Sequence, residues 1–436
     1  MLATAILAAV LRFGVSGQEA ALHALAKAVD LPTTEERQAE AQRLAQTGLS
    51  VEAWQTLMRE FGSFEEAPKG KTRYSEELVL ASGASEQTEI FVYVPESYSE
   101  DRPTPLIVAL HGTGGSGENV LRMWSATAEE LGFLVLAPSE AGENVGWGFR
   151  DRERASVEAS LRWMRRRFNV DESRIHLTGV SRGGHATWDI GMRRPDRFAS
   201  LSPMIGGPQR AGNDGNLRYL ENIARVPIRD LQGAGDSPGL IRSLEHAFEL
   251  LERFGAEDAK FIQQPNLGHS FRFDEVDWSS FLKARKEPWS ENLVRMSARE
   301  DEVQNAWIRI DELGASVEER FALRPPAGRW KRLDEEGKLR FVYKEFLTRT
   351  ARLEVQREGP GRFRTKVDGV KRFRIFLRQE DLPRKSRKKA RIRVRVGTRS
   401  QVLEAEPDAR VLLETFVERF DRTFLPVAEV LVRVPK

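Results

Sequence analysis

Cysteine is absent from this chain of 436 residues, and histidine is scarce, with six residues. Without cysteine the protein can form neither a disulfide nor a thiolate metal site, which fits both a cytoplasmic protein and an exported one built without disulfides. None of the histidines has the H-E-x-x-H or H-x-x-E-H spacing of helical zinc sites, so we predict no metal and no cofactor. The formal net charge of +3 indicates no class of charged partner.

Long apolar runs are also rare. The run 1–11 has no basic residue before it, and Arg12 stands at its end. It is either a secretory signal peptide, with a cleavage site near 15–17, or the first turns of a helix that continues to Val29. No other segment approaches the ~20 apolar residues of a membrane span, so we expect no transmembrane span. The sequence leaves both a cytoplasmic and an exported location open.

A short glycine-flanked serine motif is the most informative feature that is present. Residues 179–183 read Gly-Val-Ser-Arg-Gly, after the apolar run 175–178 and before a helix-like stretch. G-x-S-x-G at a strand-to-helix turn predicts a nucleophilic serine, because the sharp turn exposes the hydroxyl. The N-terminus of the following helix adds positive potential beneath it. Ser181 is therefore the candidate nucleophile.

A general base is expected downstream of Ser181. Apart from His185, two histidines follow the serine. His246 lies in a helical pattern, and we assign it to a helix surface. His269 lies in a loop beside a glycine, after the short apolar segment 259–262, and a loop that follows a strand can present a base to the nucleophile. We therefore predict that His269 is the base.

The acid is expected between the serine and the base. Residues 227–232 read as a strand, and 233–239 read as the loop that leaves it. Asp236 in this loop is the candidate, because its carboxylate can hold the imidazole and stabilise the imidazolium. Asp230, within the strand, and Asp214, in an earlier loop, are assigned structural roles.

A glycine-rich loop lies upstream of the serine. The apolar run 105–110 is typical of a buried parallel strand, and His-Gly-Thr-Gly-Gly-Ser-Gly follows it at 111–117. Such a loop brings backbone N–H groups close to an oxyanion, and no Gly-Lys-Ser/Thr follows to indicate a phosphate-binding loop. The N–H groups of Thr113 and Arg182 are the candidate oxyanion donors. We assign His111 the structural role of ordering the loop.

Two tryptophans near these loops have two interpretations. Trp124 follows the glycine-rich loop, and Trp147 lies in a glycine-containing loop after a predicted strand. Each is either a substrate-pocket residue or a packing residue.

Together these motifs resemble a known family, the phospholipase/carboxylesterase-type α/β-hydrolases. That family includes polyhydroxybutyrate-depolymerase-like, feruloyl-esterase-like and prolyl-oligopeptidase-like hydrolases. The resemblance covers about residues 85–286, roughly half of the chain, and its segments are 111–115, 179–184, 186–188 and 194–199. It implies a Ser-Asp-His triad at Ser181, Asp236 and His269. The family often has a His-Gly pair shortly before the acid, and here Gly233-Ala-Gly235 stands in its place.

The pattern divides the chain into three domains. We predict an N-terminal apolar segment and helical extension at 1–70, with a helix start at 32–36, and an α/β catalytic domain at 71–288. Alternating strands and helices predict a doubly wound, mostly parallel sheet, with the candidate site at the carboxyl ends of its strands. The expected strands are 88–94, 105–110, 133–138, 174–179, 198–205, 227–232 and 259–264.

Residues 289–436 differ, because short segments with period-2 alternation dominate there. This pattern predicts an accessory all-β domain of the sandwich type, similar to the β modules that follow such hydrolase domains in some bacterial esterases. The expected strands are 307–310, 339–343, 352–355, 372–376, 391–396 and 429–434.

The accessory domain carries a basic stretch. Residues 361–400 contain 16 Lys and Arg against three Asp and Glu. This stretch is either a surface for an anionic polymer, such as an acidic polysaccharide or a nucleic acid, or for anionic lipid, or it is an arginine-rich solvent face with no partner.

The sequence therefore predicts a serine hydrolase that cleaves carboxylic esters, small or polymeric, through an acyl-enzyme. Two alternatives stay open. One is a serine peptidase of the prolyl-oligopeptidase-like type, because the catalytic apparatus is the same. The other is a polyanion-binding protein with a vestigial hydrolase domain.

Overall fold

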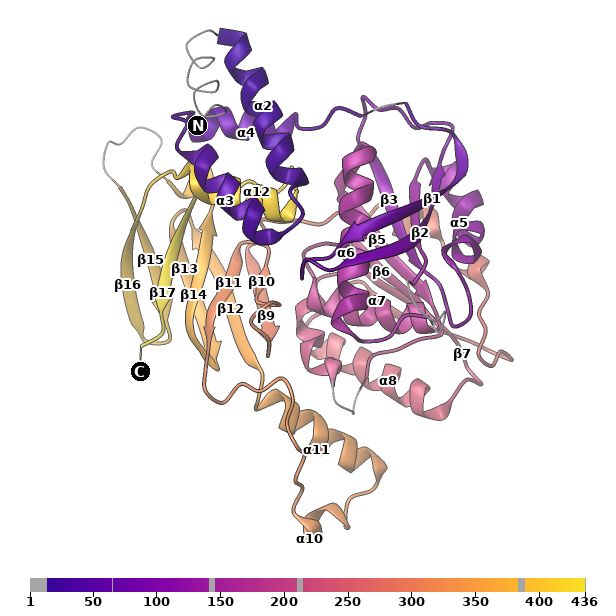
Figure 1. The fold of residues 1–436 in the computed structure, drawn as a ribbon. Helices are drawn as coiled ribbons and strands as arrows, with labels where there is room; N and C mark the ends of the chain where they lie inside the picture. The colour runs from indigo at the N-terminus through magenta and orange to yellow at the C-terminus, as the bar shows by residue number, and fades with distance from the viewer. Residues whose placement is uncertain (1–13, 65, 141–145, 210–214, 383–388, 436) are drawn as a thin grey trace.

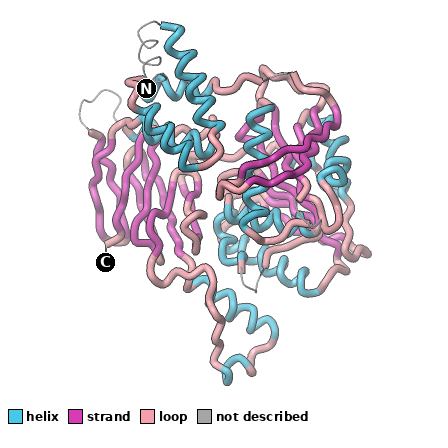
Figure 2. Tube along the Cα trace, in the orientation of Figure 1, coloured by secondary structure: helices cyan, strands magenta, loops and turns pink. Residues whose placement is uncertain are grey.

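The computed structural model describes residues 14–64, 66–140, 146–209, 215–382 and 389–435. Figure 1 shows the arrangement of its elements, and Figure 2 shows the same view by secondary structure. The apolar segment 1–11 and Asp214 lie outside the described residues. Within the described ranges, no helix combines the length and the apolar character needed to cross a bilayer.

An eight-stranded sheet forms the centre of the α/β unit, by which we mean residues 70–286. Its strand order is β1-β2-β4-β3-β5-β6-β7-β8; the β1–β2 and β2–β4 pairs are antiparallel, and every later pair is parallel. The mostly parallel sheet predicted from the sequence is thus confirmed. The strands are β1 (Gly70–Val79), β2 (Ser85–Val94), β3 (Thr104–Leu110), β4 (Leu134–Pro138), β5 (Val170–Val180), β6 (Ser200–Met204), β7 (Ile228–Gly233) and β8 (Ala259–Gln264).

Helices cover both faces of this sheet. α5 and α9 pack against one face with Trp124, Phe133 and Phe281, while α6, α7, η1 and α8 pack against the other. Burial on both faces explains why β3 and β4 read as unbroken apolar runs. The helices are α5 (Gly117–Leu131), α6 (Asp151–Arg167), α7 (Arg182–Arg193), η1 (Asn216–Ile223), α8 (Pro238–Arg253), η2 (Phe273–Glu275) and α9 (Trp278–Phe281).

Two further sheets pack face to face beyond residue 289, as the predicted sandwich requires. Their inward residues alternate along each strand and include Trp307, Phe363 and Phe373. The first sheet contains β10 (Gln304–Asn305), β11 (Ile308–Leu313), β14 (Val370–Leu377) and β17 (Ala428–Arg433). The second contains β16 (Arg399–Ala405), β15 (Ala390–Val396), β13 (Arg362–Asp368), β12 (Ala351–Gly359) and β9 (Asn292–Ser297). The short helix η3 (Gln379–Asp381) follows β14.

The N-terminal helices share a core with this sandwich. They are α2 (Gly14–Asp30), α3 (Thr34–Ala45) and α4 (Val51–Arg59), and they surround α12 (Ala409–Arg419) (Figure 1). Phe61 makes edge-to-face contacts with Phe416 and Phe420, with ring centroids 5.4 and 5.5 Å apart. The helices and both sheets therefore form one helix–sandwich unit, made of the described residues within 14–64 and 289–435. This unit is built from the two ends of the chain. The sequence instead predicts three separate domains that follow one another along the chain, at 1–70, 71–288 and 289–436.

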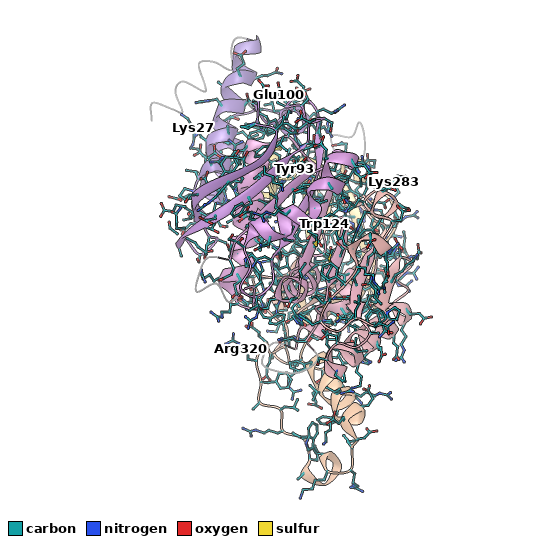
Figure 3. The ribbon with its side chains drawn as sticks, turned by 90° about the vertical axis from the view of Figure 1, so that its right-hand side faces the viewer. Lys27, Tyr93, Glu100, Trp124, Lys283 and Arg320 are labelled. Atoms are coloured by element: carbon teal, nitrogen blue, oxygen red, sulfur yellow. The ribbon has the colours of Figure 1, made fainter. Side chains whose placement is uncertain are left out.

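The predicted start of a helix near Pro32 is confirmed. Thr33 caps α3, because its side chain accepts from the Glu36 N–H while the Glu36 carboxylate accepts from the Thr33 N–H. The predicted strand at 339–343 is wrong, because these residues lie in α11 (Glu335–Leu347). α11 and the short α10 (Ala327–Trp330) project from the sandwich, and Arg320, labelled in Figure 3, lies near the base of this projection.

Candidate active site

Ser181 lies on the sharp turn between β5 and α7. Its backbone has φ 55° and ψ −113°, which is strained for a residue with a side chain. The Ser181 N–H donates to the Met204 carbonyl oxygen at 2.8 Å, and the Ser181 carbonyl accepts from the His185 N–H at 2.9 Å. These bonds hold the turn and leave the hydroxyl directed away from the backbone.

The glycines around the serine are required by close packing. A Cβ on Gly179 would lie 2.2 Å from the Gly183 carbonyl oxygen, and one on Gly183 would lie 2.1 Å from the Leu110 carbonyl oxygen. Gly206 is a third such position, because its Cβ would lie 2.6 Å from the Ser181 carbonyl oxygen. No larger residue fits at these positions without a backbone shift.

The structure brings Ser181, His269 and Asp236 together from three loops. Ser181 Oγ lies 2.9 Å from His269 Nε2, and His269 Nδ1 lies 2.7 Å from Asp236 Oδ2. Because Nδ1–H donates to the carboxylate, Nε2 is free to accept the serine proton. The His269 side chain is 51% exposed and that of Asp236 is 7% exposed, so the pair reaches from the interior to the surface.

Asp236 is held ionised by its neighbours. Burial alone would raise the pKa of its carboxyl, but the Ser237 N–H at 2.6 Å, His269 and the Gln232 Nε2–H at 2.5 Å together lower the pKa. Gln232 is fully buried on β7 and donates to the same oxygen that His269 contacts. The role of Gln232 is not apparent from the sequence, where its one signal is a polar residue inside a buried strand, four residues before the acid.

The loop after β3 lies directly against the serine. A Cβ on Gly112 would lie 3.4 Å from Ser181 Cβ. Gly146 lies against the same loop, since its Cβ would be 3.1 Å from Thr113 N and 3.3 Å from the side-chain carbon Cδ of Arg182. Thr113 is exposed at the surface of this loop.

His111 orders this loop, as the sequence predicts. Its Nε2 accepts from the Glu140 N–H at 2.9 Å, so this nitrogen carries no proton, and its Nδ1–H donates to the Gly112 carbonyl at 2.8 Å. Burial lowers the pKa of the imidazole, which favours the same neutral form. His111 is thus fully engaged with the backbone.

Comparisons with known proteins find relatives that are named as esterases and depolymerases. The chain is 29% identical over 134 residues to "Poly(3-hydroxyalkanoate) depolymerase C" of Paucimonas lemoignei, covering 28% of this chain and 32% of that protein. It is 26% identical over 190 residues to "Probable feruloyl esterase C" of Aspergillus niger, covering 41% and 66%. These relatives support an α/β-hydrolase family of the esterase type for the α/β unit.

Protein-family models and solved structures were compared with the chain as well. No protein-family model matches the chain. A solved structure titled as a thermostable esterase has 22% identity and a TM-score of 0.38, covering 49% of this chain and 58% of that one. A poly(3-hydroxybutyrate) depolymerase from Bordetella parapertussis has 18% identity and a TM-score of 0.37, covering 51% and 89%. The matched segments span about one third to two thirds of the length of the two curated relatives.

Neither tryptophan is an accessible pocket residue of this hydrolase. Trp124, labelled in Figure 3, is fully buried, with ring centroids 4.8 Å from Phe273 and 4.7 Å from Trp278. Trp147 is 1% exposed and packs 5.7 Å from the His111 ring, so it supports the loop from within. The pocket interpretation of both residues is therefore wrong, because packing hides their faces from substrate.

The remaining acidic and histidine candidates have other surroundings. Asp230 is completely buried; Trp188 Nε1–H donates to it at 2.8 Å, and burial raises the pKa of its carboxyl well above the usual range. His246 lies on α8 as predicted, but its side chain is 12% exposed because Tyr343 of α11 covers it, 5.8 Å away. In the described ranges, no group of three or more His, Asp or Glu is placed to hold a metal ion.

Proposed function

We propose that the α/β unit hydrolyses carboxylic esters through Ser181, His269 and Asp236. The observation that carries this proposal is the continuous path of hydrogen bonds, from Ser181 Oγ through His269 to Asp236 Oδ2. The three side chains stand at the carboxyl ends of β5, β7 and β8, where a rigid sheet holds them in place. The relatives named as esterases and depolymerases support the same reaction class.

The first half-reaction acylates the serine. His269 Nε2 takes the proton of Ser181 as Oγ attacks the ester carbonyl, and the negative oxygen rests on the Thr113 and Arg182 N–H groups. Asp236 stabilises the imidazolium that forms. His269 then gives its proton to the departing alkoxide, and the alcohol leaves.

The second half-reaction releases the acid. His269 removes a proton from a water molecule as the water oxygen attacks the acyl carbonyl. The tetrahedral intermediate collapses, the ester bond to Oγ breaks, and His269 returns the proton to Ser181. The products are a carboxylic acid and the free enzyme.

The open position of the site supports esters carried on larger molecules as well as small ones. Half of the His269 side chain is exposed, so a bulky alcohol or acid portion can extend into solvent. Relatives named for feruloyl esters, acetylxylan and polyhydroxyalkanoate support such substrates for this chain.

Fluorophosphonate labelling of the full chain tests the nucleophile. We expect the wild type to be labelled at Ser181, located by mass spectrometry, and the Ser181→Ala variant to stay unlabelled. Labelling of both proteins, or of neither when folded, would contradict the proposal. A p-nitrophenyl ester and a peptide anilide assayed side by side separate an esterase from a peptidase with the same triad.

A specific observation favours a second function for the helix–sandwich unit. Arg393 and Arg395 on β15 stand beside Arg362 and Arg364 on β13 in the parallel register, all exposed on the outer face of the second sheet. In the described part of the chain, no ion pair joins Arg391, Arg393 or Arg395 to a carboxylate. We propose that this face binds an anionic polymer, and salt-dependent retention of the full chain on heparin tests it.

A further inference from the structure

His185 stands one helical turn after the candidate nucleophile and has no role in the proposed triad. Its backbone N–H donates to the Ser181 carbonyl at 2.9 Å, which closes the first turn of α7. The loop after β6 passes directly beside it, since a Cβ on Gly206 would lie 2.5 Å from His185 N. β6 lies between β5, which precedes Ser181, and β7, which precedes Asp236, and the three strands are parallel. His185 therefore lies at the carboxyl edge of the sheet, among the catalytic loops.

The imidazole of His185 is held at one of its two nitrogens. Nδ1 lies 2.6 Å from the Gly207 carbonyl oxygen and 2.9 Å from the Gly207 nitrogen, so this residue binds Nδ1 in either tautomer. The Phe149 ring packs against the imidazole, with ring centroids 6.1 Å apart. The loop that supplies Gly207 is itself constrained, because Ile205 has a φ of 45°, which a β-branched residue seldom adopts. The ring is thus held in one orientation without help from a substrate.

The other nitrogen of this ring is available to a ligand. In the part of the chain that the structure describes, His185 Nε2 makes no hydrogen bond, and it is not one of the fully enclosed polar atoms that lack a partner. The side chain as a whole is half-buried. Burial lowers the pKa of the imidazole, which favours its neutral form, and the charges of His269, Arg182 and Asp236 also act on this pKa. A neutral imidazole close to the triad therefore keeps one nitrogen for a substrate.

A hydroxyl group is the partner that suits Nε2 in both tautomers. When Nδ1–H donates to the Gly207 carbonyl, Nε2 accepts from the hydroxyl. When Nδ1 accepts from the Gly207 N–H, Nε2–H donates to the hydroxyl oxygen. A substrate that covers Nε2 without such a group leaves this polar atom desolvated and unpaired, which weakens binding. The chemistry of this position thus favours substrates that carry a hydroxyl.

We propose that His185 selects esters that carry a hydroxyl group near the scissile bond, through a hydrogen bond between this hydroxyl and Nε2. The inference rests on the proposed ester hydrolysis and gives that reaction a specificity-determining residue. The hydroxyl belongs either to the acid portion or to the alcohol portion of the ester, because both portions enter the same open site. His185 takes no part in proton transfer, which stays with His269.

Ratios of kcat/KM in the full chain test this proposal, with each hydroxyl-bearing ester compared with a methyl-bearing ester of similar size. For the acid portion, the pair is p-nitrophenyl 3-hydroxybutyrate and p-nitrophenyl 3-methylbutyrate. For the alcohol portion, it is 2-hydroxyethyl butyrate and propyl butyrate, followed by acid release. We expect His185→Phe to lower the hydroxyl-to-methyl ratio about 3- to 10-fold in one of the two pairs, in line with the loss of one hydrogen bond.

A second variant and a control complete this test. A ratio within one protein does not depend on the fraction of folded enzyme, and His185→Ala gives the same ratios if the phenyl ring disturbs the turn. His23→Phe, at an exposed position on α2, should keep both wild-type ratios. Unchanged ratios in the His185 variants, with all four esters hydrolysed, overturn the inference and leave the proposed function standing. Absence of ester turnover in the wild type overturns the proposed function, and the inference with it.

Discussion

Two buried polar clusters, one in each unit of this protein, use charge in different ways. In the helix–sandwich unit a buried arginine and a buried carboxylate form a matched pair: Arg357 Nη2 lies 2.8 Å from Asp381 Oδ2, and both side chains are almost completely buried. In the α/β unit, Asp236 is also well supplied with donors, but its chain of bonds continues through His269 to an exposed serine. A buried charge serves stability in the first case and is placed for proton transfer in the second.

Strain shows the same difference. The α/β unit places Ser181 at a positive φ beside glycines that tolerate no Cβ, and these positions converge on one turn. In the helix–sandwich unit, glycines with positive φ are spread over separate turns: an added Cβ on Gly397 would have no atom within 4 Å, whereas one on Gly369 would lie 2.9 Å from Val317 Cγ2. Strain concentrated at one point is typical of a functional site.

The largest effect is expected when the nucleophile of the α/β unit is removed. We expect Ser181→Ala to lower kcat on a p-nitrophenyl ester by about 10⁴- to 10⁶-fold, because no other group at the site can form the acyl-enzyme. The melting temperature should change little. Ser279→Ala, at an exposed position on α9, is the matched control and should keep full activity. Retained turnover in Ser181→Ala would remove the serine mechanism.

The second-largest effect is expected at Asp236, the acid of the proposed triad. Asp236→Asn keeps the shape of the side chain, but the amide no longer holds the imidazole of His269 in the tautomer that leaves Nε2 free. We therefore expect kcat to fall by about 10⁴-fold. Asp230→Asn is the control six residues away, because burial favours the neutral form of its carboxyl and Trp188 keeps an oxygen acceptor. That variant should stay within about threefold of the wild type. Equal losses in both would place the acid elsewhere.

A buried ion pair joins the two units, and we expect its loss to lower the stability of the protein without changing the catalytic step. Lys286 Nζ lies 2.5 Å from Asp421 Oδ2, and both side chains are buried. Asp421→Asn leaves the ammonium buried without its partner, and we expect a loss of about 3–5 kcal/mol in the free energy of unfolding. Urea denaturation measures this loss. Ester kcat at low temperature should stay unchanged, and Asp101→Asn, at an exposed position, is the control.

The same pair gives a pH dependence. Burial raises the pKa of Asp421, but Lys286, Arg165 and Arg419 outweigh it and hold the pKa well below its usual range. Stability from a depressed carboxyl pKa is present above the unfolded value of about 3.9 and is lost as the pH falls below it. The wild type should therefore weaken below about pH 4. In Asp421→Asn this part of the acid sensitivity should be missing.

The sequence predicted the local features of the α/β unit well, for physical reasons. Strands buried on both faces appear as apolar runs, and the serine turn needs glycines at fixed spacing. β1 (Gly70–Val79) was missed because it is an edge strand with mostly polar residues, which carry little pattern. Gln232 was missed because its role depends on a loop that folds back over it.

The helix–sandwich unit was harder to predict, because its organisation depends on distant contacts. Nothing local in the N-terminal helices specifies that Phe61 packs on Phe416. The segment 339–343 reads as a strand by alternation, yet the cap Asp334 and the buried pair Val342 and Phe346 fit a helix, and the helix prevails. Hydrophobic patterns in the sequence predict which residues are buried. They less often predict which distant residues pack against them.

Gln232 offers a smaller test of how the acid is supported. Gln232→Leu removes one of the donors that lower the pKa of Asp236, so this pKa should rise. We expect kcat/KM to fall by about tenfold, in line with the loss of one hydrogen bond to a charged group. The acid limb of the pH profile should move to higher pH, which a merely structural role would not cause. Gln263→Leu, at an exposed position on β8, is the control.

The smallest effects on folding and chemistry are expected at the basic face of the sandwich. Replacing Arg391, Arg393 and Arg395 together by Gln should change stability by less than about 0.5 kcal/mol each and leave ester turnover intact, because these side chains are exposed. If the face binds an anionic polymer, the salt dependence of heparin binding should weaken by a log–log slope of about three. The full chain is required, since residues 289–435 share their core with the N-terminal helices. Unchanged retention would show that this face is an arginine-rich surface without a polymer partner.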